Sequence, residues 1–350
     1  MKIILYTNNL ATVGGIETSM YELAKYLRTY HDVHVRYRTI SQLQMKRYKE
    51  AGIDIQQEKD ETCDVLIIGS VWHQPAQIAA KVTVQQIHAD WSDAFWCGGA
   101  SGMQLIKKSE PRADIFAAVS NSAAEFTKRV VNKPVITMNN LAPERFAIER
   151  KKNTTLVFGA FTRMTSEKGE ANYQAFRKRI IELGIEAEFR VYTPGDAPEG
   201  WTKHEPVQDI RTELPSVDYV VSLADTESFG YTIAEANSCG IPCVIKRVNS
   251  TEEFFNDKDN LILDDVTAFT KKDLRRKISN YTLRQDTEAN IDNAIQLFET
   301  MQSSVAILMC KRDFYDIKSK IERRLGSRFT ADRTRAEELL SNEHNIVEQL

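Results

Sequence analysis

Short apolar runs that alternate with helix-like stretches constrain this chain more than any other feature of its sequence. Such runs are typical of parallel strands that are buried on both faces, and the stretches between them are long enough for crossover helices. The pattern predicts β-strands at Lys2–Tyr6, Val33–Tyr37, Asp64–Ile68, Thr83–Ile87, Asp114–Val119, Pro134–Thr137, Thr154–Gly159, Ala187–Tyr192, Val217–Ser222 and Pro242–Ile245.

These runs form two series, and a charged stretch from residue 144 to residue 153 separates them. A chain of 350 residues is long for one core, because single cores stop growing at roughly 250–300 residues. We therefore expect an α/β fold of two Rossmann-like domains, residues 1–145 and 146–310, that face a central cleft. Helices are expected near Glu170–Leu183 and Tyr231–Ser238. Residues 311–350 are expected to form a helical C-terminal extension.

Composition excludes several classes of protein. With 42% hydrophobic and 27% charged residues and a net charge of −3, the chain is neither disordered nor a nucleic-acid binder. It has no apolar run near the ~18 residues of a membrane span and enters its first predicted strand without a signal-peptide pattern, so we expect it in the cytoplasm. Five cysteines and six histidines are scattered, and neither a metal site nor a disulfide framework is expected.

Two glycine-containing loops follow predicted strands. The first ends in Gly14-Gly15 before an apolar-faced helix, and it suits either an anion at a helix N-terminus or a simple tight turn. It lacks the Gly-x-Gly-x-x-Gly spacing of a dinucleotide site. The second carries Arg163 and Lys168 before Gly169. These two cations either neutralise a diphosphate or are ordinary solvated charges.

A third loop carries the pair Glu227 and Glu235, with seven residues between them. Glu227 is expected in the loop after the strand Val217–Ser222, and Glu235 about one turn inside the next helix. A carboxylate after a strand can accept both hydroxyls of a ribose, and the other can bind a sugar hydroxyl. The alternative of two exposed acids conflicts with their apolar surroundings, where unpaired carboxylates are costly.

Together, and in this order, these motifs resemble the retaining glycosyltransferases of family 4, which have the GT-B fold. The resemblance extends over roughly residues 1–265. It rests on Gly14-Gly15-Ile16-Glu17, on Arg163 with Lys168-Gly169, on Glu227-Ser228-Phe229-Gly230, and on Glu235-Ala236 followed by Gly240-Ile241-Pro242.

The resemblance implies a role for each matching residue. Arg163 and Lys168 would hold the diphosphate of a nucleotide-sugar, which Gly15 approaches from the first domain. Glu235 would bind the ribose. The donor sugar and its phosphate would be bound by Glu227 and the amides of Ser228, Phe229 and Gly230.

Three positions depart from the family's pattern. His88 resembles a sugar-contacting His-Asp pair, but Ala89 stands before Asp90, and a lone histidine after a strand is often a packing residue. Thr162 stands where the family usually has glycine. Asn139-Asn140 stands where it usually has Asn-Gly, a mild change because asparagine tolerates positive φ.

The implied activity is metal-independent sugar transfer with retention of configuration, in which Glu227, Arg163, Lys168 and His88 are the catalytic candidates. No cofactor is expected besides the nucleotide-diphosphate sugar as co-substrate, a UDP-sugar in preference to a GDP-sugar. Two alternatives stay open: a sugar-nucleotide epimerase with the same fold, and a non-catalytic interaction subunit. A nicotinamide oxidoreductase lacks its fingerprint.

The acceptor is the least determined part. A cell-surface glycan, a glycolipid or lipid-linked sugar, or a wall polymer would each fit, and the sequence does not indicate the oligomeric state. Five basic residues suggest either a face for an anionic membrane or polymer, which would place the protein at the inner membrane surface, or solvated charge: Arg36, Arg38, Lys46, Arg47 and Lys49. Residues 97–102 suit an acceptor-side loop or an ordinary connection.

Overall fold

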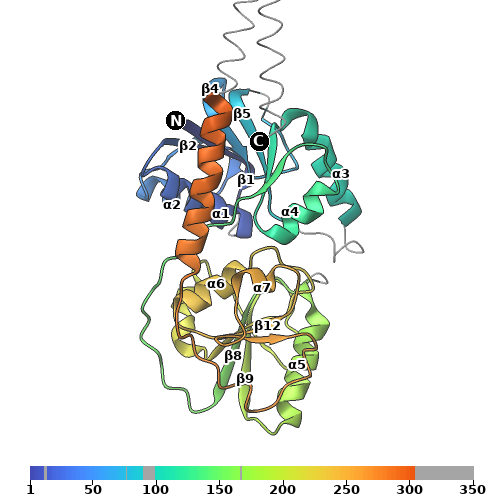
Figure 1. Ribbon diagram of the computed structural model, residues 1–350. Helices are drawn as coiled ribbons and strands as arrows, with labels where there is room; N and C mark the ends of the chain where they lie inside the picture. Colours follow the sequence, from blue (N-terminus) through green and yellow to red (C-terminus); the bar gives the residue numbers. More distant parts are fainter. Residues whose placement is uncertain (12–13, 76, 90–98, 166–167, 304–350) are drawn as a thin grey trace, which may run out of the picture. The chain divides into compact units, whose positions relative to one another are not determined.

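The computed structural model describes residues 1–11, 14–75, 77–89, 99–165 and 168–303 of the chain. Met1–Glu299 form one compact unit and Thr300–Leu350 a second. Both sheets of the described chain belong to the first unit (Figure 1).

The first sheet has seven strands, in the order β3-β2-β1-β4-β5-β6-β7. Every pairing in it is parallel. In the central register Leu5 lies between Val35 and Ile67, and all three are fully buried. The strands are β1 (Lys2–Leu10), β2 (Asp32–Ile40), β3 (Asp54–Gln57), β4 (Glu61–Ile68), β5 (Ile78–Ile87), β6 (Ile115–Ala118) and β7 (Val135–Thr137).

Helices connect β1 to β2, β2 to β3, β5 to β6 and β6 to β7, a common crossover between parallel strands. They are α1 (Gly15–Leu27), α2 (Gln42–Glu50), α3 (Gly99–Ser109) with the 3-10 turn η2 (Glu110–Arg112), and α4 (Asn121–Lys128). Serine starts two of them: the Ser41 hydroxyl accepts the Gln44 amide at 3.3 Å, and the Ser120 hydroxyl accepts the Ala123 amide at 3.1 Å. Such caps satisfy amides that the helix leaves unpaired.

The second sheet has six parallel strands, in the order β10-β9-β8-β11-β12-β13. Its strands are β8 (Leu156–Phe161), β9 (Ala187–Tyr192), β10 (Thr202–His204), β11 (Tyr219–Ser222), β12 (Cys243–Lys246) and β13 (Leu261–Leu263). The connecting helices are α5 (Glu170–Glu182), η4 (Ile210–Thr212), η5 (Leu214–Ser216), α6 (Tyr231–Ser238) and α7 (Thr251–Phe254).

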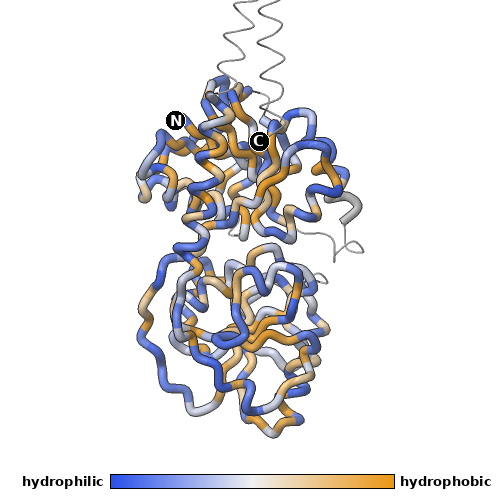
Figure 2. The backbone as a smooth tube through the Cα atoms, in the orientation of Figure 1, coloured by the Kyte–Doolittle hydropathy of each residue, from blue (hydrophilic) through white to orange (hydrophobic). Residues whose placement is uncertain are grey.

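Alternate residues of each strand fill two separate cores. Phe158 packs with Phe176 of α5 on one face, whereas Val157 belongs with Ile233 of α6 on the other. Burial on both faces explains why the strands are hydrophobic along their whole length. Figure 2 shows these hydrophobic stretches along the strands of both sheets.

The expected α/β fold with two Rossmann-like sheets is confirmed, and each of the ten predicted strands overlaps an observed one. Three short edge strands were not predicted: β3, β10 and β13. The first sheet ends at Thr137 and the second begins at Leu156, but the domain boundaries 1–145 and 146–310 stay predictions. Residues 311–350 lie outside the described residues.

After the second sheet the chain is helical from residue 283 to residue 303. This helix returns to the first half, where the Tyr26 hydroxyl donates to Asp292 at 2.8 Å. The Asn139 amide donates to Asn290 at 2.6 Å. Within the described residues, no helix is both long and apolar enough to span a membrane.

Candidate functional site

The loops after β8 and β11 meet because these strands are neighbours in the second sheet. Lys168 comes from the first loop and Glu227 from the second. Their Nζ and Oε2 atoms are 3.3 Å apart, and the side chains are 24% and 27% exposed. The carboxyl ends of the strands therefore hold a cation and a carboxylate that a ligand can still reach.

Two glycines make this meeting possible. Gly169 and Gly230 have φ of +73° and +84°, a backbone conformation that residues other than glycine rarely adopt. A Cβ at position 169 would also lie 2.4 Å from the Leu223 carbonyl oxygen. Only glycine therefore allows the backbone at position 169, immediately after Lys168, to approach the Leu223 carbonyl just after β11 this closely.

The helices at the predicted phosphate loops begin without a side-chain cap. Gly14, Gly169 and Gly230 stand at the N-caps of α1, α5 and α6, and none can provide the hydrogen bond that serine provides in α2 and α4. First-turn amides carry a partial positive charge. At these three helix ends the N-cap residue itself therefore leaves the first-turn amides to other partners, such as an anion.

The Glu227 loop is held in place by neighbouring polar groups. The Ser228 amide donates to Glu227 Oε1 at 3.1 Å, and the Ser250 hydroxyl donates to the Glu227 carbonyl oxygen. Phe229 is 2% exposed and anchors the loop in the core. A small pocket lies at this edge, lined by Ser222, Ala224, Glu227, Phe229, Ile233, Ile245, Lys246, Val248, Ser250, Thr251 and Phe255.

His88, at the end of β5, adjoins this loop. Its carbonyl oxygen accepts the Ser228 hydroxyl at 2.5 Å. Both ring nitrogens are buried and find no hydrogen-bond partner among the described residues. Burial lowers the pKa of His88 to about 4, so the imidazole is neutral at neutral pH.

Glu235 lies in α6 as expected, but among different partners from those of Glu227. Burial and, to a lesser extent, Asp209 raise its pKa to about 7, while Arg211 and Arg47 act in the opposite direction. Arg211 is itself paired with Asp209 at 2.6 Å. The two glutamates therefore occupy separate electrostatic environments.

Two residues of the predicted site, Arg163 and Gly15, are accessible to a ligand. Arg163 is exposed, and no ion pair or hydrogen bond of its guanidinium is found within the described part of the chain. Gly15 is the first residue of α1, and a Cβ added there would meet nothing within 4 Å. Space for a ligand's approach is thus present at Gly15.

The Asn139-Asn140 step does not use the left-handed conformation, since no described non-glycine residue has positive φ. Instead, Asn140 is 5% exposed and accepts the Ser19 hydroxyl at 2.6 Å. Asn139 donates through its side chain to the Val119 carbonyl at 3.1 Å. The asparagines serve as hydrogen-bonding residues, so tolerance of positive φ is not the reason for them.

The five-residue basic face does not form. Arg36 is 2% exposed and enclosed by carboxylates, Arg47 lies 3.7 Å from Glu22, and Lys46 lies 3.6 Å from Glu50. The loop 97–102 lies largely outside the described residues.

Sequence reasoning missed a second ion pair beside the first. Lys246 pairs with Asp225, and Asn172 donates to the same Asp225 oxygen at 3.0 Å. Lys246 is the last residue of β12, and Asp225 comes three residues after β11. Their positions at the carboxyl ends of these two strands were the available signal. The described residues contain no cluster of three or more His, Cys, Asp or Glu side chains suited to a metal ion.

The family model and the sequence relative each match only part of the chain. Residues 200–298 match the family model described as glycosyl transferases group 1. That segment includes Glu227 and Glu235 but not Arg163 or Lys168. The chain is also 27% identical, over 188 residues, to N-acetyl-alpha-D-glucosaminyl L-malate synthase of Bacillus anthracis. The match spans 46% of this chain and about half, 49%, of that relative.

Solved structures resemble the chain over most of its length. HepE of Anabaena in complex with UDP-glucose has a TM-score of 0.64 at 12% identity, with 89% of this chain and 100% of HepE covered. A TarM variant of S. aureus, in complex with fondaparinux, alpha-GlcNAc-glycerol and UDP, has a TM-score of 0.62 at 9% identity, covering 89% and 99%. The chain has the GT-B fold. Identity this low shows the fold alone.

Proposed function

We propose that this chain is a retaining, metal-independent glycosyltransferase of family 4. It transfers a sugar from a nucleotide-diphosphate sugar, a UDP-sugar in preference to a GDP-sugar, to an acceptor hydroxyl. The observation that carries the proposal is the contact between Lys168 and Glu227, which lies where the uncapped helices α5 and α6 begin. The family match over residues 200–298 supports it, as do the UDP-containing complexes of structurally similar proteins.

Charge complementarity supports the role of each residue. In this proposal Lys168, Arg163 and the open helix amides, with Gly15 approaching from the first half, neutralise the diphosphate as it departs. Glu227, together with the amides of Ser228, Phe229 and Gly230, holds the donor sugar and its phosphate. Glu235 accepts the ribose hydroxyls, and the neutral His88 lies on the sugar side.

The reaction balances without a cofactor. The bond between the sugar C1 and the diphosphate oxygen breaks, while a bond from the acceptor oxygen to C1 forms on the same face. The acceptor proton passes to the leaving phosphate oxygen. The proposal places the reaction in the cytoplasm, with a glycan, a glycolipid or a wall polymer as acceptor.

The test is incubation of the full chain with UDP-glucose, UDP-N-acetylglucosamine, UDP-galactose or GDP-mannose and a panel of methyl glycosides as acceptors, in the presence of EDTA. We expect UDP release from one UDP-sugar, with the α configuration kept in the product. An isomerised donor would instead identify an epimerase. Failure of the chain to bind UDP in calorimetry would overturn the proposal.

A further inference from the structure

The loop after β4 presents an exposed aromatic side chain. Trp72 is 72% exposed, although its loop is well anchored. The Gly69 amide donates to the Tyr6 carbonyl at 2.8 Å, and Gln74 donates to the fully buried Gln85 at 2.5 Å. The indole is therefore held outward by an ordered loop, and no ring of another described residue covers it.

A cluster of planar polar groups adjoins Trp72. The next residue is His73. Its Nδ1 lies 3.3 Å from the Arg38 guanidinium, within hydrogen-bond distance, and its Nε2 lies 3.7 Å from a carboxylate oxygen of Glu58. Arg38 Nε lies 3.4 Å from the other oxygen of Glu58. The side chains of Arg38, His73 and Glu58 are 52%, 31% and 20% exposed, respectively. Each can still exchange a hydrogen bond with a ligand hydroxyl.

The sheet order brings this cluster beside the strand that leads to the predicted phosphate loop. His73 follows β4, Arg38 lies on β2 and Glu58 follows β3, while β1 runs between β2 and β4. The His73 ring lies 6.0 Å from that of Tyr6 on β1. The loop after β4 therefore lies against β1, the strand that leads to Gly14 and Gly15.

We propose that Trp72, with Arg38, Glu58 and His73, forms a saccharide subsite that binds a sugar ring of the acceptor; this rests on the proposed function. An indole face packs against the C–H face of a pyranose, and the planar polar groups bind its hydroxyls. A membrane or protein surface would require a wider apolar patch. Here the residue that follows the exposed aromatic belongs to a cluster of charged and polar groups.

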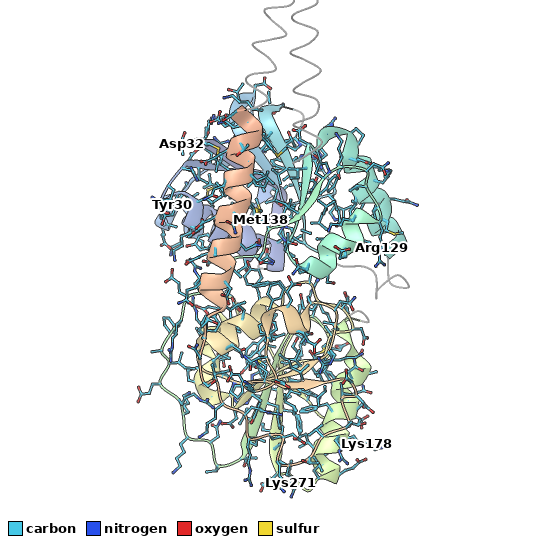
Figure 3. The ribbon with its side chains drawn as sticks, in the orientation of Figure 1. Tyr30, Asp32, Arg129, Met138, Lys178 and Lys271 are labelled. Carbon is cyan, nitrogen blue, oxygen red and sulfur yellow. The ribbon has the colours of Figure 1, made fainter. Side chains whose placement is uncertain are left out.

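Tyr30 provides a matched control. It is also 72% exposed, but it precedes β2 and so lies at the amino edge of the same sheet (Figure 3). Its ring pairs with Tyr26 at 6.0 Å. A general effect of removing an exposed aromatic would therefore appear equally in Tyr30→Ala and Trp72→Ala.

The experiment measures saturation-transfer NMR signals of methyl glucosides, galactosides and N-acetylglucosaminides with the UDP-saturated full chain. We expect a signal for at least one glycoside, reduced about five- to ten-fold by Trp72→Ala, partly kept by Trp72→Phe and unchanged by Tyr30→Ala. UDP affinity should be equal in all variants. An unchanged signal in Trp72→Ala, or no signal from the wild type, overturns the subsite. Glycoside binding without use of any donor would uphold the subsite and refute the proposed function.

Discussion

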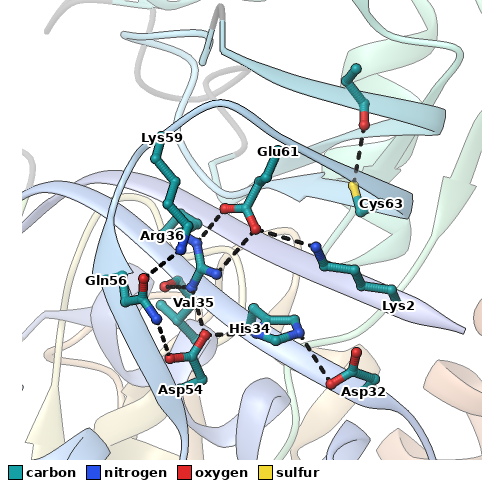
Figure 4. A network of polar contacts seen from close by, with 11 residues as sticks. Lys2, Asp32, His34, Val35, Arg36, Asp54, Gln56, Lys59, Glu61 and Cys63 are labelled. Atoms are coloured by element: carbon teal, nitrogen blue, oxygen red, sulfur yellow. Dashed lines mark hydrogen bonds and ion pairs between the residues drawn. The ribbon is translucent and has the colours of Figure 1, made fainter.

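Two pairs of opposite charges, one in each sheet, differ in how completely they are satisfied. Arg36 and Glu61 lie on β2 and β4 with 2% and 9% of their side chains exposed. Arg36 also donates to Asp54 at 3.0 Å and to the Val35 carbonyl at 3.0 Å (Figure 4). Lys168 makes one contact with Glu227, and both side chains remain about a quarter exposed.

The difference separates a structural pair from a binding pair. A buried guanidinium that uses four of its five donors inside the protein has little left to offer a ligand. An ammonium with one long contact keeps donors free, and the uncapped helices beside it do so as well. Residue type alone could not make this distinction, because both pairs consist of a cation and a glutamate.

The largest expected effect tests the structural pair. Arg36→Ala leaves Glu61 and Asp54 without their cation, so we expect the free energy of unfolding to fall by about 3–5 kcal/mol. Arg38→Ala, on the same strand but half exposed, should cost less than about 1 kcal/mol. Urea denaturation measures both. Equal stability of the two variants would contradict the structural role of Arg36.

The Arg36 network also predicts a pH dependence. Although burial acts to raise it, hydrogen bonds from His34, Gln56 and Arg36 lower the pKa of Asp54 to about 2. A lowered folded pKa contributes stability above the unfolded value of 3.8 and loses it as the pH falls towards 2. The difference between wild type and Arg36→Ala should therefore shrink below about pH 4.

The second prediction tests the binding pair. Lys168→Ala removes a cation from the proposed diphosphate site, and we expect turnover to fall about 10²–10³-fold. Stability should change by less than about 1 kcal/mol, since the ion pair is partly solvated. Lys178→Ala, on the exposed side of α5 (Figure 3), is the control and should retain turnover. Near-normal transfer by Lys168→Ala would refute the assignment.

The two pairs also show how far sequence reasoning reached. Apolar periodicity was sufficient for the ten main strands, and post-strand position brought Lys168 and Glu227 to the same sheet edge. The short edge strands β3 and β10 escaped because half of their residues face solvent and carry no apolar run. Arg36 was grouped with surface cations because burial of an arginine depends on partners from β3 and β4, which local sequence does not show.

The third prediction concerns Glu235, whose pKa burial raises to about 7, with Asp209 adding to the effect. A raised folded pKa gives stability that is fully present below the unfolded value of 4.5 and is lost as the pH rises through 7. Glu235→Gln is neutral throughout. It should match wild type at pH 5 and be more stable by about 1–3 kcal/mol at pH 8.

The same variant should lose affinity for nucleotide. A ribose-binding carboxylate must be ionised to accept two hydroxyls, so wild-type UDP affinity should increase between pH 6 and pH 8. In Glu235→Gln we expect about five-fold weaker binding with no such increase. Exposed Glu199 supplies the control Glu199→Gln. If Glu235→Gln were more stable than wild type and bound UDP with the same affinity, Glu235 would not be part of the nucleotide site.

The smallest effect concerns a helix end that one of the protein's own carboxylates fills. Glu253, in α7, accepts the Asn121 amide at 2.8 and 2.9 Å and so satisfies the N-terminus of α4, whereas the N-cap glycines of α1, α5 and α6 provide no such group. Glu253→Ala should cost about 1 kcal/mol, seen as roughly five-fold faster hydrogen exchange of the Asn121 and Ser122 amides. Glu252→Ala, whose carboxylate instead pairs with Arg247, should leave that exchange unchanged. Equal exchange in both variants would show that α4 needs no anion, and the contrast between filled and open helix ends would lose its physical basis.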